Sequence, residues 1–139
     1  MEQFEIVGQL NEEQLEALQQ LYQETWWGKG RKQAAIRRML HHSDIIVGLC
    51  EPIGGKLVGF SRILTDYVYR ATIWDVIVDP AYQGRGLGRA IVQAVIHHPD
   101  LQEVETFLLI CLPEAIAFYE KVGFTTEVGK LQIMARTQK

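Results

Sequence analysis

The sequence has little cysteine, no excess of positive charge and no long apolar run, and each absence excludes a class of protein. Two cysteines, Cys50 and Cys111, are too few for a disulfide scaffold and favour a reducing compartment. Fourteen lysines and arginines against seventeen aspartates and glutamates give a net charge of −3, which argues against a nucleic-acid partner. The longest apolar run, residues 107–113, is far shorter than the roughly 18 residues that cross a membrane.

The sequence also lacks internal repeats, linkers rich in proline, glycine or serine, and a basic N-terminal segment followed by an apolar one. These absences predict one domain over residues 1–139, located in the cytoplasm and without a secretory signal. The four histidines form two adjacent pairs, at 41–42 and 97–98, without metal-ligand spacing. We therefore expect no metal site.

Apolar spacing and turn residues predict alternating helices and strands. Asn11 and Gln14 can form a capping box at the start of the first helix. Helical spacing then predicts helices over residues 11–26, 32–41, 87–98 and 113–122. Strand-forming residues predict strands over 44–50, 57–64, 71–78, 105–111 and 125–135, of which the apolar run 105–111 suits a strand covered on both faces. This order indicates an α/β or α+β domain with a mixed sheet.

A glycine-rich turn joins the strand predicted at 71–78 to the helix predicted at 87–98. Its sequence is Gln83-Gly84-Arg85-Gly86-Leu87-Gly88-Arg89. Backbone N–H groups at such a turn point outward at the positive end of a helix dipole, where they favour phosphate oxygens. Gly86 and Gly88 allow close approach to the backbone, and Arg85 and Arg89 can add charge.

The sequence of this turn does not match either of two common nucleotide-binding motifs. A dinucleotide fingerprint that starts at Gly84 would need a third glycine where Arg89 stands, and the sequence G-x-x-x-x-G-K-[ST] is absent. From the glycines alone, a tight turn without a ligand is an equal alternative.

Two segments together resemble the signatures of the GNAT superfamily of N-acetyltransferases. Gln83-x-x-Gly86-x-Gly88, after a strand that ends in Val-Asp-Pro, resembles the loop that binds the pyrophosphate of acetyl-CoA. Residues 115–124, AIAFYEKVGF, resemble the second signature. The resemblance implies a mixed, mostly antiparallel twisted sheet with a central parallel strand pair and about four flanking helices. It also implies direct acetyl transfer from acetyl-CoA to a primary amine, without a metal.

A narrower similarity lies in residues 71–80, ATIWDVIVDP. They are similar to the plant plastid and cyanobacterial branch of serotonin (arylalkylamine) N-acetyltransferases, which favours a small arylalkylamine as acceptor. A protein lysine or N-terminal amine and a polyamine remain alternatives within the enzymes. A non-catalytic acetyl-CoA-binding module is an alternative from another class, although binding alone would not require Tyr119.

The resemblance also implies roles for single residues. Tyr119 matches the tyrosine that protonates the departing thiolate, and a phenol keeps its proton at neutral pH; a core aromatic is the alternative. Leu112 departs from the family pattern, because many members have a cofactor-contacting asparagine there. The expected cofactor contacts are Ile77, Val78, Gln83, Gly84, Arg85, Gly86, Leu87, Gly88, Arg89 and Phe118.

Asp75 lies between apolar residues of the strand at 71–78, and strict alternation puts it on the face of Ile73 and Ile77. A carboxylate there is costly unless it is paired or lines a wet cleft. It is therefore a catalytic group that acts through water, an anchor for the substrate ammonium, or a structural hydrogen-bonding node.

Three tryptophans are candidate walls of the acceptor site. Trp26 and Trp27 are adjacent and cannot both face the core of a regular helix, so at least one lines a surface or groove. Trp74 stacks on an indole-like substrate, lines the channel for the pantetheine arm of the cofactor, or packs in the core. GNAT proteins are often dimers, so a homodimer joins the amine substrate as a partner that the resemblance implies, although no segment identifies an interface.

Overall fold

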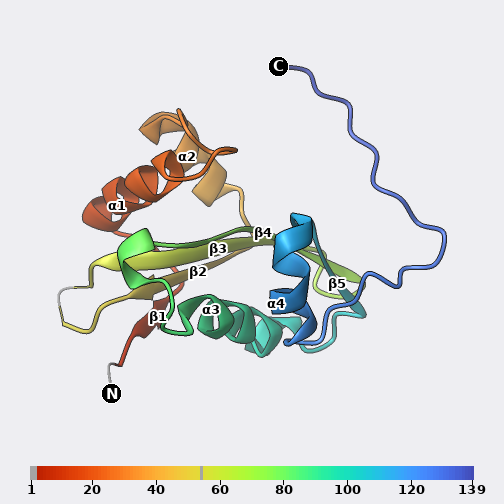
Figure 1. Ribbon diagram of the computed structural model, residues 1–139. Coiled ribbons are helices and arrows are strands. Elements are labelled where there is room, and N and C mark those ends of the chain that lie inside the picture. The colour runs from red at the N-terminus through yellow and green to blue at the C-terminus, as the bar shows by residue number, and fades with distance from the viewer. Residues whose placement is uncertain (1–2, 54) are drawn as a thin grey trace.

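The structure, a computed structural model, describes residues 3–53 and 55–139, which form a five-stranded sheet with helices on both faces (Figure 1). The sheet contains β1 (Glu5–Val7), β2 (Ile45–Cys50), β3 (Leu57–Thr65), β4 (Arg70–Val78) and β5 (Thr106–Leu109). The α-helices are α1 (Glu12–Gln23), α2 (Gln33–His41), α3 (Leu87–Ile96) and α4 (Ile116–Glu120). Short 3₁₀ turns are η1 (Pro80–Tyr82), η2 (Pro99–Leu101) and η3 (Pro113–Ala115).

The strands follow the order β1-β2-β3-β4-β5, and the first four pair antiparallel. β4 and β5 pair in parallel, from Arg70 opposite Thr106 to Ile73 opposite Leu109. The mixed sheet with its parallel pair confirms the expected fold class. Because β5 ends at Leu109, it pairs with only the first half of β4, and the second half of β4 is left open on that side.

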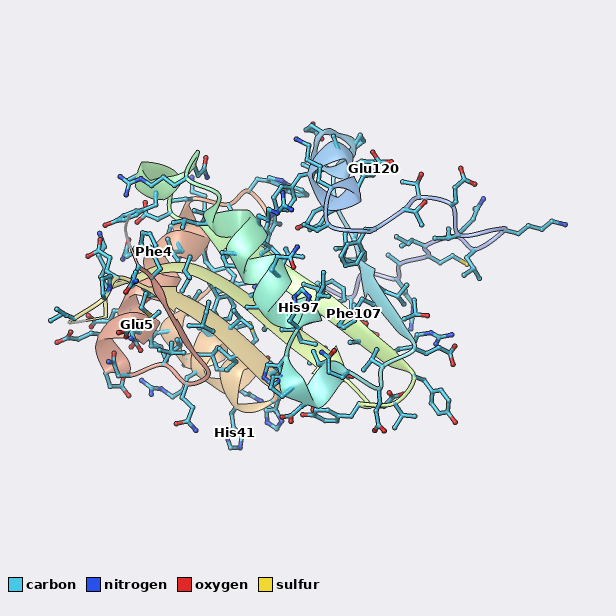
Figure 2. The ribbon with its side chains drawn as sticks, turned by 90° about the horizontal axis from the view of Figure 1, so that it is seen from below. Phe4, Glu5, His41, His97, Phe107 and Glu120 are labelled. Atoms are coloured by element: carbon cyan, nitrogen blue, oxygen red, sulfur yellow. The ribbon has the colours of Figure 1, made fainter. Side chains whose placement is uncertain are left out.

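The two faces of the sheet carry separate apolar clusters. Leu18 and Tyr22 of α1 and Ile36 of α2 pack against Phe60 and Ile77 on one face. On the other face, Leu87, Ile91 and Val95 of α3 pack against the strand residues Val58 and Ile73. Seen from below, α3 lies across the sheet (Figure 2), and Phe107 of β5 packs against the cluster on this face.

The start of α1 is set by the predicted capping box. The Gln14 N–H donates to Asn11 Oδ1 at 2.8 Å, and the Asn11 N–H donates to Gln14 Oε1 at 2.9 Å. This reciprocal pair satisfies two N–H groups that the helix itself cannot. It fixes the N-terminal end of α1, and Tyr22 lies at the other end of the same helix.

Residues 125–135 do not form the strand that their sequence predicts. They pair with no strand of residues 3–53 and 55–139, and residues 125–139 are all exposed and run away from the sheet (Figure 1). A strand is stable only beside a partner, and Gly129, at φ +69°, interrupts the extended backbone. The parallel pair β4–β5 therefore lies at one side of the sheet rather than at its centre.

β5 is shorter and less covered than the run 105–111 indicates. It lies at the edge of the sheet, and its side chains are half-buried or exposed. The expectation of cover on both faces is wrong because only one face is packed: Phe107 and Leu109 lie against the α3 cluster, whereas Leu108 on the opposite face is 41% exposed. β1 was not expected, since three residues with two exposed side chains give no alternation to detect. No helix in the described ranges is both long and apolar enough to cross a bilayer.

Candidate functional site

A cavity of about 550 Å³ lies where the chain leaves β4 and β5. Three parts of the chain form its wall: the end of β4, the glycine-rich loop with the first turn of α3, and the segment from η3 into α4. The lining residues are Val76, Val78, Gln83, Gly84, Gly86, Leu87, Gly88, Arg89, Ala115, Phe118 and Tyr119. The fold thus brings together the two segments that resemble GNAT signatures.

The loop before α3 exposes its backbone to this cavity. Gly84 and Gly86 have φ of +83° and +77°, a region that favours glycine, and a Cβ at either position would meet no atom within 4 Å. Gly86 is the N-cap of α3 and makes no side-chain cap, so the first N–H groups of α3 have no intrahelical partner. Together with the helix dipole, these groups fit the phosphate oxygens of acetyl-CoA. Arg89 adds a positive side chain to the same wall.

Gly88 serves a different purpose from Gly84 and Gly86. A Cβ at this position would lie 3.4 Å from Phe118 Cζ and 3.9 Å from Val78 Cγ2. The first turn of α3 can therefore approach α4 and β4 closely. This contact holds the loop against the wall that carries Tyr119.

Tyr119 is half-buried on α4, and its ring lies edge-on to the rings of Phe118 and Phe124, with centroids 4.9 and 5.9 Å away. Burial, with a smaller contribution from the Cys111 thiol, raises the pKa of Tyr119 to about 12. The phenol therefore holds its proton throughout the neutral range. In the part of the chain that the structure describes, no group hydrogen-bonds to its Oη.

Asp75 is at an irregular point of β4 and is almost fully buried, with its side chain 6% exposed. Its φ of +57° accompanies a register shift opposite Phe60 and Arg62 of β3. This bulge changes which residues share a face. Asp75 lies on the α1 face with Ile77, as expected, but Ile73 packs on the α3 face, so strict alternation is wrong at this point.

The Asp75 carboxylate is paired rather than free. Its Oδ2 accepts hydrogen bonds from Tyr22 Oη at 2.8 Å, Arg62 Nε at 2.9 Å and Arg31 Nη1 at 3.1 Å. Burial, then the negative charge of Asp75, raises the pKa of Tyr22, so this phenol remains a donor. Two guanidinium groups beside one carboxylate leave the cluster positive, which disfavours an additional ammonium. The geometry therefore supports the structural alternative for Asp75.

Asp75→Asn should lower the free energy of unfolding by about 2 kcal/mol, because it leaves the mostly buried Arg62 and the partly buried Arg31 without their counter-charge. Urea denaturation measures this change. Glu105→Gln is the matched control: it breaks the exposed Arg70–Glu105 pair and should cost a small part of that amount. A catalytic base at Asp75 would give the opposite result, with a large loss of kcat and unchanged stability.

The three tryptophans occupy different environments. The Trp27 ring lies edge-on to Tyr22 with centroids 5.8 Å apart, and the Arg31 guanidinium lies 5.3 Å from the Trp27 ring. Trp74 has a buried Nε1 without a hydrogen-bond partner in the described chain, and Arg62 lies over its ring. Trp26 is 76% exposed in the turn after α1. The structure thus brings Trp27 and Trp74 to the Asp75 cluster and leaves Trp26 outside it.

Two expected cofactor contacts lie away from the cavity lining. Ile77 is buried in the α1 cluster, and the Arg85 guanidinium lies 5.1 Å from the Tyr82 ring centroid. Their roles remain predictions. Sequence reasoning missed Val76 and Ala115, although two signals were available: Val76 is two strand positions before Val78, and Ala115 is one helical turn before Tyr119. Within the described ranges, no group of three or more metal-binding side chains is arranged to hold an ion.

Comparison with known proteins agrees with this geometry. Residues 11–124 match the model of the acetyltransferase (GNAT) family. A crystal structure from Xanthomonas campestris pv. campestris, described as belonging to the GNAT family, superimposes with a TM-score of 0.83 and 31% identity. That alignment covers 99% of this chain and 95% of the other.

Two curated relatives are also similar. An uncharacterized N-acetyltransferase, ycf52, from Porphyra purpurea is 38% identical over 109 residues, which are 77% of this chain and 62% of the relative. Serotonin N-acetyltransferase 2, chloroplastic, from Oryza sativa subsp. japonica is 32% identical over 107 residues, 76% of this chain and 54% of the relative. The chain thus spans little more than half the length of these relatives.

These matches confirm the resemblance in the loop at 83–88 and the segment at 115–124, and they confirm the enzyme class at the level of the family, whose named members are N-acetyltransferases. The chain belongs to the acetyltransferase (GNAT) family.

Proposed function

We propose that this protein transfers the acetyl group of acetyl-CoA to the primary amine of a small arylalkylamine such as tryptamine or serotonin. The observation that carries the proposal is the single cavity wall on which the exposed backbone before α3 meets Tyr119 of α4. The exposed backbone suits an anionic cofactor, and the Tyr119 hydroxyl suits proton donation.

Different residues of the cavity hold different parts of the cofactor. When bound, acetyl-CoA supplies an acetyl thioester that an amine can attack. The N–H groups of residues 84–89 bind its phosphate oxygens, and Arg89 adds charge. The second half of β4, open on the β5 side, presents backbone groups at Val76 and Val78 to the acyl arm. Ala115 and Phe118 exclude water from the opposite wall.

Tyr119 holds the proton that the departing thiolate needs. Its raised pKa keeps Oη protonated, and donation to sulfur makes the thiol a better leaving group than the thiolate. None of the residues that line the cavity is a carboxylate or a histidine. The amine therefore loses its proton to water or arrives neutral, and Asp75 positions the arginines and Tyr22 rather than acting as the base.

The aromatic surface at Trp27 and Trp74 supports an arylalkylamine as acceptor. Trp27 is 37% exposed beside Tyr22, so its open side suits stacking on an indole ring, and the positive Asp75 cluster next to it favours the neutral form of the amine. The rice relative is by name a serotonin N-acetyltransferase, which favours the same substrate class. That relative is also chloroplastic by name, so the reducing compartment expected from the two free cysteines includes a chloroplast as well as the predicted cytoplasm.

A panel of acceptors tests this proposal by thiol release from acetyl-CoA. We expect serotonin and tryptamine to give a higher kcat/KM than spermidine or lysine peptides. Trp27→Ala should raise the KM for tryptamine about fivefold, because a lost aromatic contact is worth on the order of 1 kcal/mol, and should leave the KM for acetyl-CoA unchanged.

Tyr69→Ala, which removes an exposed aromatic ring at the β3–β4 turn, is the matched control and should change neither constant. A lysine peptide or spermidine used more efficiently than both indoles would contradict the choice of acceptor. It would leave acetyl transfer itself intact.

A further inference from the structure

Arg31, in the connection between α1 and α2, is held in place through both its side chain and its backbone. Its Nη1 donates to Asp75 Oδ2 at 3.1 Å. Its guanidinium carbon lies 4.7 Å from the ring centroid of Tyr22 and 5.3 Å from that of Trp27. The Gln19 side chain donates to its backbone carbonyl. A guanidinium fixed in this way loses little conformational freedom when it binds a further group.

Most hydrogen-bond donors of the Arg31 guanidinium are open. An arginine side chain has five N–H groups. Within residues 3–53 and 55–139, the one group to which the Arg31 side chain donates is the Asp75 carboxylate. The Arg31 side chain is 34% exposed and the Asp75 side chain 6% exposed, so a group that approaches from solvent meets the guanidinium before the carboxylate.

The cluster around Asp75 has more positive charge and more donors than its own chain compensates. Arg62 Nε donates at 2.9 Å to the same oxygen that Arg31 uses, so two cations share one carboxylate. The neighbouring Trp74 Nε1 is buried and has no hydrogen-bond partner in the described ranges. The cluster therefore favours a second anion, supplied from outside the chain. A carboxylate suits a guanidinium best, because its two oxygens match the planar fork of N–H donors.

The cluster lies next to both the cavity and the aromatic surface of the acceptor side. Asp75 directly precedes Val76 in β4, and Val76 lines the cavity. The connection between α1 and α2 lies on the face of the sheet opposite α3 (Figure 1). An acceptor whose ring stacks on the open side of Trp27 therefore lies beside the Arg31 guanidinium.

We propose that Arg31 binds a carboxylate of the acceptor, so that the preferred substrate is an arylalkylamine with an anionic group in addition to its reacting amine. This inference rests on the proposed function, because it concerns the acceptor of the same reaction. Arg31 is then the residue that selects the acceptor by charge. It favours an acidic substituent and disfavours the additional ammonium groups of spermidine.

Isothermal titration of the protein saturated with CoA tests the carboxylate site without turnover, because CoA carries no acetyl group. One pair of probes is tryptamine with a carboxylate on its indole ring and the matching carboxamide. The other pair is L-tryptophan and L-tryptophanamide, in which the group is on the carbon that carries the amine. We expect the carboxylate of one pair to bind at least about tenfold more tightly than its carboxamide, because charge-assisted hydrogen bonds are stronger than neutral ones.

Arg31→Met should reduce this preference to within about twofold. The variant keeps the Arg62–Asp75 pair, which is neutral as a whole, so we expect wild-type circular dichroism and an unchanged dissociation constant for CoA. Arg38→Met is the matched control: it removes an exposed arginine of α2 and should keep the full preference for the carboxylate. Equal binding of carboxylate and carboxamide in both pairs, or a preference that persists in Arg31→Met, overturns the proposal.

Thiol release from acetyl-CoA, measured with the same probes, separates this inference from the proposed function. Amine-dependent thiol release without a preference for either carboxylate contradicts the role of Arg31 and leaves acetyl transfer to arylalkylamines intact. A preference for the carboxylate that disappears in Arg31→Met, without thiol release from any amine, supports the carboxylate site and contradicts the proposed function.

Discussion

Tyr119→Phe should lower kcat about 100-fold or more and leave the dissociation constant of acetyl-CoA within about twofold, because general acids of this kind contribute roughly 10²–10⁴ to rate. The change removes only the hydroxyl. The phenylalanine ring keeps the edge-on packing against Phe118 and Phe124 that positions α4. Steady-state kinetics with tryptamine and a separate titration with CoA measure the two quantities.

Two further results sharpen this prediction. Tyr67→Phe alters an exposed tyrosine outside the cavity and should leave kcat unchanged. Because burial raises the pKa of Tyr119 above its ordinary value, to about 12, the wild type should not lose activity through this residue at mildly alkaline pH. A Tyr119→Phe enzyme with the wild-type kcat would remove the general-acid assignment.

Gly86→Glu should weaken CoA binding at least about 100-fold. The carboxylate would enter the wall where backbone N–H groups receive phosphate oxygens, and losing two charge-assisted hydrogen bonds costs on the order of 3 kcal/mol. The positive φ of Gly86 adds backbone strain to any side chain at this position. Isothermal titration with CoA measures the loss.

Gly30→Glu is a suitable control for backbone strain, because Gly30 has φ +92° and open space for a Cβ but lies outside the cavity lining. Its dissociation constant for CoA should match the wild type. Equal affinity in Gly86→Glu and the wild type would show that the cofactor does not bind at this loop, and the functional proposal would fail with it.

Much of the cavity wall could be predicted from the sequence because its signals are local. The order of glycines at 84, 86 and 88 and the segment at 115–124 reflect short-range requirements of a strand-to-helix turn and a short helix. The capping box of α1 is equally local, and the structure contains it as predicted. Such features depend on neighbouring residues and need no knowledge of the tertiary fold.

The cluster around Asp75 was harder to predict. The bulge at Asp75 interrupts the two-residue alternation on which face assignment depends, and its partners Tyr22, Arg31 and Arg62 come from three distant parts of the chain. No spacing in the sequence indicates that these three residues lie beside Asp75.

The prediction of a strand at 125–135 failed for another reason. Strand propensity reports that a segment suits a sheet, but it does not report whether a partner strand is available beside it.

The most direct test of the account follows both products in one reaction of the wild-type protein with acetyl-CoA and tryptamine. Thiol is measured by a chromogenic reagent and N-acetyltryptamine by mass spectrometry. We predict that the two products form in a one-to-one ratio and that thiol release requires the amine. Tight CoA binding without amine-dependent thiol release, with tryptamine and with every other amine of the panel, would contradict the assignment of this cavity as an acetyltransferase site.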